Sequence, residues 1–400
     1  MSHTLAPLAA ADQSLVGRTV LQIVPDLQSG GAERATIDMA EALAQAGGRS
    51  LVASRGGRMV SELQSKGGVW LPFPAATKNP IAMALNSVQL ARILRDEGVD
   101  IVHARSRAPA WVAYYATRQT GVKFVTTYHS AYYGASPVKL RYNAIMASGD
   151  IVIAISDFAA KRIRDLHPEA AERIVVIPRG ADLRAFSPTA VAPSRVARLR
   201  TEWGVAPHER IILLPARLAA RKGHAVMIEA AKRLLSEAVS DVRVLFVGDP
   251  HSDSFRRNVE TQITRAGLSG FVRNVGHCDD MPAAYLAAAV IVAPSTEPEA
   301  FGRVAIEAQA MGAPVIVSDI GASPEIVAAP PQCAPHEATG WRVPPGDAAA
   351  LARAIGEALE MKAFAREEMA LRARAVVQSR FSVEQMQRAT LDVYRRLLGQ

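Results

Sequence analysis

The stretch from Val290 to Val317 reads VIVAPSTEPEAFGRVAIEAQAMGAPVIV, and it decides the fold. Its two ends, 290–293 and 314–317, are short runs of apolar and β-branched residues that predict strands. Between them the chain turns through Pro298 and Gly302 and then follows a helical pattern that begins near Arg303. A strand, a helix and a second strand in this order form a βαβ unit, whose two strands are parallel.

The same alternation of apolar runs and helical segments extends in both directions along the chain. Runs that predict strands occupy 20–24, 50–54, 70–73, 100–104, 124–129, 151–155 and 174–177, and then 211–215, 242–247 and 271–275. Helices are predicted between them, for example at 32–46, 86–97 and 108–119. The Val/Ile runs lack polar alternation, which indicates strands buried on both faces. We therefore expect an α/β protein with two doubly wound, Rossmann-like parallel sheets that face each other across a cleft.

Chain length and proline content suggest where the domains begin and end. At 400 residues the chain is too long for one comfortable core, so two domains are the simplest count. Pro188, Pro193 and Pro207 interrupt the pattern around a short basic helix. We expect a tail at 1–18, an N-terminal domain at 19–186, a linker at 187–207, a C-terminal domain at 208–382, and a terminal helix at 383–400 that could pack back on the first domain.

Composition narrows the class of partner. Lys and Arg number 46 against 38 Asp and Glu, a net charge of +8 that suits an anionic partner. The 46 basic residues include only 8 Lys, so part of this excess reflects composition rather than binding. No nucleic-acid-binding motif accompanies the charge, and we expect no nucleic acid partner. Cys278 and Cys333 have no companions at metal-ligand spacing, which indicates neither a disulfide framework nor a zinc site.

The N-terminus and the hydropathy pattern bear on location. The first residues, MSHTLAPLAAADQSLVGRT, lack the basic start and continuous apolar core of a secretory signal. No uninterrupted run reaches the roughly 18 apolar residues of a membrane span. We expect a cytoplasmic protein, with any contact to the cytoplasmic face of the inner membrane peripheral.

Loops that follow the predicted strands carry the residues suited to chemistry. Gly30 and Gly31 join the first strand to a helix, where backbone N–H groups and the helix dipole favour a phosphate. The loop 216–224, ARLAARKGH, gathers cations suited to a pyrophosphate. Either loop would look the same as a turn or a solvated segment without a ligand. Glu299 and Glu307, with the amides near Phe301 and Gly302, suit the binding of sugar and ribose hydroxyls.

Taken together, these motifs resemble the retaining glycosyltransferases of family 4, whose fold is the two-domain GT-B architecture. GGAER near the start resembles the glycine loop of that family, and ARLAARKG resembles its basic clamp. PEAFGRVAIEAQAMGAPVIVSD is similar to its E-x7-E segment, and 177–182, IPRGAD, is similar to its interdomain element. The four motifs occur in the family's order between about Val20 and Leu398.

The resemblance implies a role for particular residues. Arg217 and Lys222 would neutralise the diphosphate, and Glu299 would hold the donor sugar with the amides of Phe301 and Gly302. Glu307 would bind the ribose. Gly30 and Gly31 would lie against the donor, and His129 resembles the family's active-site histidine near the donor sugar. On this basis His129, Arg217, Lys222 and Glu299 are the catalytic candidates.

Some positions depart from the family pattern or leave alternatives open. Arg179 stands where Asn is commoner, and with Arg105 and Arg107 it is a weak candidate for binding an anionic acceptor. Glu297 precedes Glu299 and is an alternative to it. A lone histidine at a strand end, such as His129, is more often structural than catalytic.

The implied reaction is transfer of a sugar from a nucleoside diphosphate sugar, with retention of anomeric configuration. No Asp-x-Asp triplet occurs, which favours catalysis without a metal or other cofactor. GDP-mannose is favoured over UDP or ADP sugars on overall similarity, and a lipopolysaccharide-core or lipid-linked glycan is the expected acceptor. Segment 132–147 mixes aromatic and basic residues suited to an anionic bilayer surface. A nucleotide-sugar epimerase and a two-domain sugar-binding protein are the alternatives.

Overall fold

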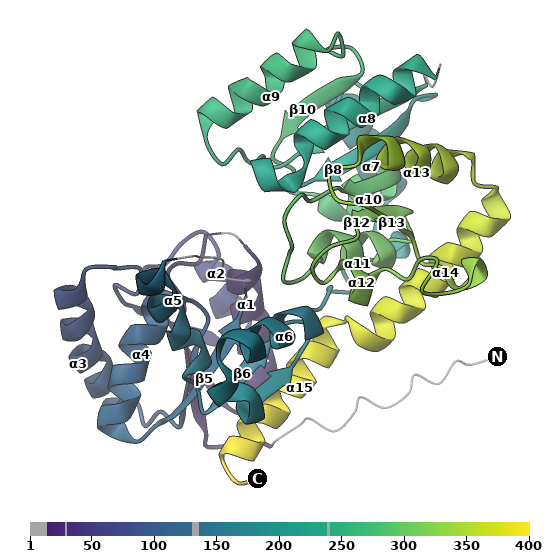
Figure 1. Ribbon diagram of the computed structural model, residues 1–400. Helices are drawn as coiled ribbons and strands as arrows, with labels where there is room; N and C mark the ends of the chain where they lie inside the picture. The colour runs from purple at the N-terminus through teal and green to yellow at the C-terminus, as the bar shows by residue number, and fades with distance from the viewer. Residues whose placement is uncertain (1–13, 29, 130–135, 238–240) are drawn as a thin grey trace, which may run out of the picture. The chain divides into compact units, whose positions relative to one another are not determined.

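The computed structural model describes residues 14–28, 30–129, 136–237 and 241–400. The chain forms two compact units (Figure 1). Of the described residues, the first unit comprises those up to Pro178 together with 386–400, and the second comprises those from Arg179 to Gln385. Each unit has its own parallel sheet and its own buried core.

The sheet of the first unit has seven parallel strands in the order β3-β2-β1-β4-β5-β6-β7. The strands are β1 Thr19–Ile23, β2 Arg49–Ser54, β3 Gly68–Pro72, β4 Ile101–Ala104, β5 Lys123–Tyr128, β6 Ile151–Ala154 and β7 Ile174–Val176. The helices are α1 Gly31–Gln45, α2 Val60–Ser65, α3 Pro80–Asp96, α4 Arg107–Thr120, α5 Pro137–Ala144 and α6 Asp157–Leu166. Strand order reverses between β1 and β4, which makes the carboxyl ends of these two strands the expected place for a ligand.

The sheet of the second unit has six parallel strands in the order β10-β9-β8-β11-β12-β13. The strands are β8 Arg210–Pro215, β9 Val242–Val247, β10 Val272–Gly276, β11 Ala288–Ala293, β12 Val315–Ser318 and β13 Trp341–Val343. The helices are α7 Pro193–Glu202, α8 His224–Ser236, α9 Asp253–Arg265, α10 Met281–Ala287, α11 Arg303–Ala310, α12 Ser323–Ile326, α13 Ala348–Glu360 and α14 Ala363–Arg380. The order reverses between β8 and β11.

These two sheets confirm the predicted α/β fold class with two doubly wound parallel sheets. The sequence did not predict β13, because this strand is only three residues long and carries Arg342 at its centre. The central strands are fully buried, as expected for sheets covered on both faces.

The terminal helix α15, Val383–Leu397, supplies core residues to the first unit. Met386, Leu391 and Tyr394 pack with Met39 of α1 and with the strands of the sheet. Gln387 Nε2 also donates a hydrogen bond to the backbone carbonyl of Asp38 at 2.6 Å. A segment remote in sequence thus completes the core of the first unit.

The expected linker at 187–207 differs from the division of the structure, which falls after Pro178. Helix α7 belongs to the second unit, where Arg195 forms a two-pronged ion pair with Asp280, at 2.6 and 2.8 Å. Asp280 is the N-cap of α10. Such bidentate pairing has defined geometry and holds the segment to the domain. Among the described residues, no helix combines the length and apolar character required to cross a membrane.

Candidate functional site

Topology brings two loops of the second unit to one place. Lys222 lies in the loop after β8, and Ser295 and Glu299 lie in the loop after β11. These are the two strands between which the sheet order reverses. The side chains of all three residues line a pocket of about 110 Å³. The site therefore occupies the crevice that doubly wound sheets generally use for ligands.

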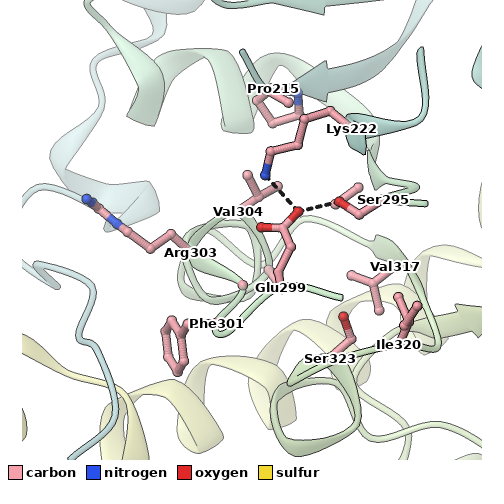
Figure 2. A pocket seen from close by; sticks show the side chains of 14 residues that line it. Pro215, Lys222, Ser295, Glu299, Phe301, Arg303, Val304, Val317, Ile320 and Ser323 are labelled. Carbon is pink, nitrogen blue, oxygen red and sulfur yellow. Dashed lines mark hydrogen bonds and ion pairs between the residues drawn. The ribbon is translucent and has the colours of Figure 1, made fainter. Parts of the chain in front are cut away.

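The centre of the pocket is a carboxylate held by two donors. Lys222 Nζ lies 2.7 Å from Glu299 Oε1, and the Ser295 hydroxyl donates to the same oxygen. Figure 2 shows the three side chains converging, while the side chain of Arg303 extends away from them. An ammonium group has three donors, so Lys222 retains the capacity to bind an anion while it holds Glu299.

Close backbone contacts fix the two loops. Gly223, at the start of α8, has φ +74°, and a Cβ there would come within 1.8 Å of the Pro294 carbonyl oxygen. Gly321 has φ +68°, and a Cβ there would lie 2.5 Å from the Glu299 carbonyl oxygen. The amide of Ala322 donates to that same carbonyl at 3.0 Å. Glycine is required at both positions, because any larger residue would collide with the neighbouring backbone. These close contacts hold the loops that carry Lys222 and Glu299 in place.

Helix α11 begins in the wall of the pocket. Its N-cap is Gly302, which offers no side chain to cap the first amides of the helix. Phe301 and Gly302 line the pocket, as does Arg303. Phe301 is buried, with its ring edge-on to Phe381 at 6.0 Å between centroids. Amides at a helix N-terminus favour oxygen atoms that carry negative charge.

Glu307 lies one helical turn further along α11 and is buried. Its Oε2 accepts from the Tyr285 hydroxyl at 2.9 Å, and its Oε1 accepts from Arg303 Nη2 at 2.7 Å. Burial, and then the neighbouring Glu307 charge, raises the pKa of Tyr285 well above its usual value. Glu307 is not among the residues that line the pocket around Glu299.

Two further residues from the loops lie apart from this pocket. Arg217 follows β8 but is exposed and does not line the pocket. Glu297 is exposed as well, whereas Glu299 lines the pocket and pairs with Lys222. Of the two alternative carboxylates, the geometry favours Glu299.

A buried histidine lies directly behind the basic loop. His224 begins α8 and is 1% exposed, with its ring edge-on to Phe246 at 5.0 Å between centroids. Burial is the main cause that lowers the pKa of His224 to about 4; the Ala219 backbone acts in the opposite direction, and the Lys222 charge acts in the same direction as burial. The imidazole is therefore neutral at pH 7 and adds no charge to the loop.

In the first unit, the glycine loop and His129 follow their predicted strands. Gly30 is the N-cap of α1, with φ +139°, and Gly31 is the first residue of that helix. Only glycine adopts this backbone region readily. His129 comes directly after β5 and is half-buried. Gly30 and His129 therefore lie after strands of the first unit, and Lys222 and Glu299 lie after strands of the second.

Arg105 is not at an exposed, acceptor-facing position, in contrast to the expectation from sequence. It is 4% exposed, and its Nε and Nη2 both donate to Gln22 Oε1, at 3.0 and 2.8 Å. The backbone N–H of Arg105 extends the pairing of β4 with β1 by donating to Ile23. Since side chains alternate along a strand, Arg105 points to the same face as His103, into the core.

Arg107 bonds within the first unit, and Arg179 is buried. Arg107 Nη1 donates to Asn143 Oδ1 at 2.7 Å, which joins α4 to α5. Arg179 is 6% exposed, so little of its side chain is accessible to an acceptor. The adjacent Gly180 lies against the Ser382 backbone, and Ala181 pairs with that segment.

Sequence reasoning missed several residues of the site. Ser295 and Arg303 lie within the quoted stretch, and their places after the strand and at the helix start were the available signal. Ser323, which also lines the pocket, and Tyr285 come from other segments, and no motif marks them. Over the described ranges, no three His, Cys, Asp or Glu side chains gather into a group able to hold a metal ion.

The fold is that of the GT-B class of glycosyltransferases, and comparison with known proteins gives the family. Residues 29–185 match Glycosyltransferase Family 4, and residues 196–376 match Glycosyl transferases group 1. The chain belongs to this family of glycosyltransferases and is a glycosyltransferase enzyme. The family assignment leaves the epimerase and the sugar-binding protein without support.

Individual relatives agree with this class. A glycosyltransferase structure from Rickettsia africae ESF-5 is 34% identical, with a TM-score of 0.85 and coverage of 95% of this chain and 98% of that one. An Anabaena structure of HepE in complex with UDP-glucose shares the fold at 24% identity and a TM-score of 0.81, covering 94% and 99% of the two chains. D-inositol 3-phosphate glycosyltransferase of Nocardia farcinica is 34% identical over 183 residues, 44% of this chain and 39% of that protein.

Proposed function

We propose that the protein transfers a sugar, with retention of configuration and without a metal ion, from a nucleoside diphosphate sugar to a lipopolysaccharide-core or lipid-linked glycan. The observation that carries this proposal is the Lys222–Glu299 pair beside the N-terminus of α11, at the reversal point of the second sheet. Each of these groups suits one part of such a donor. The Lys222 cation suits the diphosphate, the Glu299 carboxylate suits the sugar hydroxyls, and the helix amides suit the oxygens that link sugar and diphosphate.

In this proposal the bond from the anomeric carbon to the diphosphate breaks, one to the acceptor hydroxyl oxygen forms on the same face, and the hydroxyl proton passes to the departing diphosphate. Lys222 and the α11 amides stabilise the charge on the departing diphosphate, which is the largest help available to such a reaction. Arg217 adds long-range positive charge from its exposed position. Glu299 accepts hydrogen bonds from the sugar hydroxyls and orients the ring.

Glu307 has the proposed role of binding the ribose of the donor. The contacts with Tyr285 and Arg303 hold its carboxylate in one orientation before any ligand arrives. We also propose donor contacts for three residues of the first unit. Gly30 and Gly31 would lie against the donor, and His129 would lie near the donor sugar.

The proposed donor rests on the similarity of this sequence to its family, and the thermal-shift measurement below tests it. GDP-mannose is the donor that the sequence resemblance favours, and a UDP sugar is the alternative named by the Anabaena complex. We also propose that the protein is cytoplasmic and that it makes peripheral contact with an anionic membrane. Of segment 132–147, Tyr132 and Tyr133 lie outside the described residues, while Lys139 and Arg141 are exposed on α5.

The test measures donor binding by thermal shift against GDP-mannose, UDP-glucose and an ADP sugar, each with the free nucleotide as a companion. A ligand that binds the folded state at 100 times its Kd stabilises by about 2.7 kcal/mol, which gives a clear rise in Tm. Glu299→Gln should lose the part of the shift that the sugar adds to the free nucleotide. A lack of any shift with all three sugars would contradict the proposal.

Retention and independence from metal are tested on the product. We expect an anomeric configuration equal to that of the donor by NMR, and transfer that persists after exhaustive dialysis against EDTA. An inverted product, or activity that disappears with the chelator and returns with Mg²⁺ or Mn²⁺, would overturn these parts of the proposal.

A further inference from the structure

The first unit carries an apolar groove that the proposed transfer reaction does not use. The groove has a volume of about 670 Å³ and lies over α3, α4 and α5, which Figure 1 shows on one side of this unit. Aromatic side chains from α4 and α5 form much of its wall, namely Trp111, Tyr115 and Tyr142. Trp111 Nε1 donates to the Tyr142 carbonyl at 3.2 Å, so the wall has a defined shape.

Exposed aliphatic side chains flank the groove. On α3, Ile81 is 74% exposed, Leu85 is 67% exposed and Val88 is 44% exposed, and the spacing of four and three residues places them on one helix face. Val138 of α5 is 80% exposed and lies one turn before Tyr142, which lines the groove. A concentration of apolar side chains of this kind marks an interaction surface rather than ordinary scatter.

The charge on these three helices is mostly positive. Every charged residue from Lys78 to Arg95, and every charged residue of α4 and α5, is basic. The exposed members are Lys78, Arg92, Arg95, Arg118, Lys139 and Arg141. The nearest acid in α3 is its last residue, Asp96. An apolar face bordered mainly by cations complements a surface with an apolar interior and anionic headgroups.

We propose that this face, made by α3, α4 and α5, docks the protein on an anionic phospholipid bilayer, with Ile81, Leu85 and Val138 inserted among the acyl chains and the aromatic wall at headgroup depth. Tyr and Trp rings prefer this depth because each has an apolar body and a polar edge. The inference extends the proposed function, because a lipid-linked acceptor is itself held in a bilayer, but it rests on residues of the first unit alone.

The same charge pattern disfavours the other occupants of an apolar face. Two copies of this chain that met through this surface would bring like charges together, which is unfavourable. A protein partner would require an acidic counterpart, and its binding would not depend on lipid. A bilayer satisfies both the apolar and the cationic parts at once.

The experiment measures co-sedimentation of the full-length protein with vesicles of phosphatidylglycerol, and with vesicles of phosphatidylcholine alone. We expect binding to the anionic vesicles that weakens as salt rises, and little binding to the neutral ones. The double variant Ile81→Ser with Leu85→Ser should lower the bound fraction at least about tenfold, since two inserted aliphatic side chains are lost. These side chains are largely exposed, so the variant should fold normally.

The control removes exposed apolar side chains elsewhere. Phe364 and Leu371 of α14 are 72% and 57% exposed and lie in the second unit. The variant Phe364→Ser with Leu371→Ser should bind vesicles like the unchanged protein. Quenching of tryptophan fluorescence by brominated phosphatidylglycerol should be reduced in Trp111→Phe, which reports on the groove itself.

Specific results would overturn the inference. Absence of binding to phosphatidylglycerol vesicles would do so, as would equal binding by the α3 double variant. Self-association without lipid that disappears in the α3 variant would show that a second copy occupies the face. Donor-induced thermal shift should be unchanged in that variant, so a protein that binds vesicles but no nucleotide sugar contradicts the proposed function and not the docking surface.

Discussion

The two sheets have the same strand order around their reversal points, yet the cations at those points have opposite surroundings. In the first unit, Arg105 follows β4 and lies buried against Gln22. In the second unit, Lys222 follows β8 and lies in a pocket against Glu299. Both residues are basic and both follow a buried strand. The comparison teaches that position after a strand identifies a candidate, whereas the direction of the side chain decides its role.

The partners of the two cations explain the difference. Arg105 belongs to a buried polar cluster in which His103 Nδ1 lies 2.6 Å from the Tyr394 hydroxyl and His103 Nε2 lies 2.6 Å from Thr127 Oγ1. This cluster connects the central strands to α15. Lys222 has as its partner a carboxylate that is itself accessible to a ligand. We therefore expect substitutions in the first cluster to change stability, and substitutions in the second to change turnover.

The largest effect is expected at Lys222. Lys222→Ala should lower kcat by roughly 100- to 1000-fold, the cost typical of removing one stabilising donor from a developing charge. Transfer is measured under saturating donor, and circular dichroism checks the fold. Arg221→Ala, which removes an exposed neighbouring cation, should remain within about twofold. A near-normal kcat in Lys222→Ala would break the comparison between the two cations.

Glu299 should show the next largest effect. Glu299→Ala should reduce kcat/KM by about 100-fold, because a carboxylate that orients the sugar is lost. Glu297→Ala is the matched control, since Glu297 is exposed and lies only two residues away. Equal losses in the two variants would show that the pocket geometry has misidentified the carboxylate.

Tyr394→Phe tests the buried cluster of the first unit. The change removes the Tyr394 hydroxyl that lies 2.6 Å from His103 Nδ1, so the free energy of unfolding should fall by about 1–3 kcal/mol. Chemical denaturation followed by fluorescence measures this loss, and kcat per folded molecule should be unchanged. Tyr115→Phe, at a position 51% exposed, should leave stability unaffected. A change in kcat without a change in stability would assign the cluster a role in catalysis.

Acid should destabilise the protein through its buried histidines. Burial, together with the Arg105 charge, lowers the pKa of His103 well below its usual value, and burial lowers that of His224 to about 4. Below pH 6.5 the unfolded chain gains protons that the folded chain does not, so stability is lost as the pH falls from 6.5 toward 4. Denaturation at pH 7.5 and pH 5 should differ by about 2 kcal/mol from His224 alone.

A pair of variants isolates the contribution of His224. His224→Gln should have a smaller loss of stability between pH 7.5 and pH 5, because its side chain does not titrate. His336→Gln, at an exposed position, should retain the full pH dependence. If His224→Gln shows the same pH dependence as the unchanged protein, His224 titrates normally in the folded state.

Periodicity and motif order predicted most of the fold and the centre of the site. The apolar runs located twelve of the thirteen strands in the described part of the chain, and β13 was missed because its run is short and polar at the centre. Gly223, Lys222 and Glu299 were marked by their places after strands β8 and β11. The burial of Arg105 and Arg179 was not predictable in the same way, since the sequence of a loop does not reveal which neighbouring elements cover it.

The sequence by itself determined the βαβ repetition, the two parallel sheets and the family, because these depend on local periodicity and on motifs whose residues lie close together in the chain. The tertiary structure decided which of the marked residues meet. The pairing of Lys222 with Glu299, the support of Glu307 by Tyr285, and the contact of Tyr394 with His103 join residues separated by 77, 22 and 291 positions. Such contacts depend on how strands are ordered and how side chains alternate across a sheet, and only the folded chain fixes both.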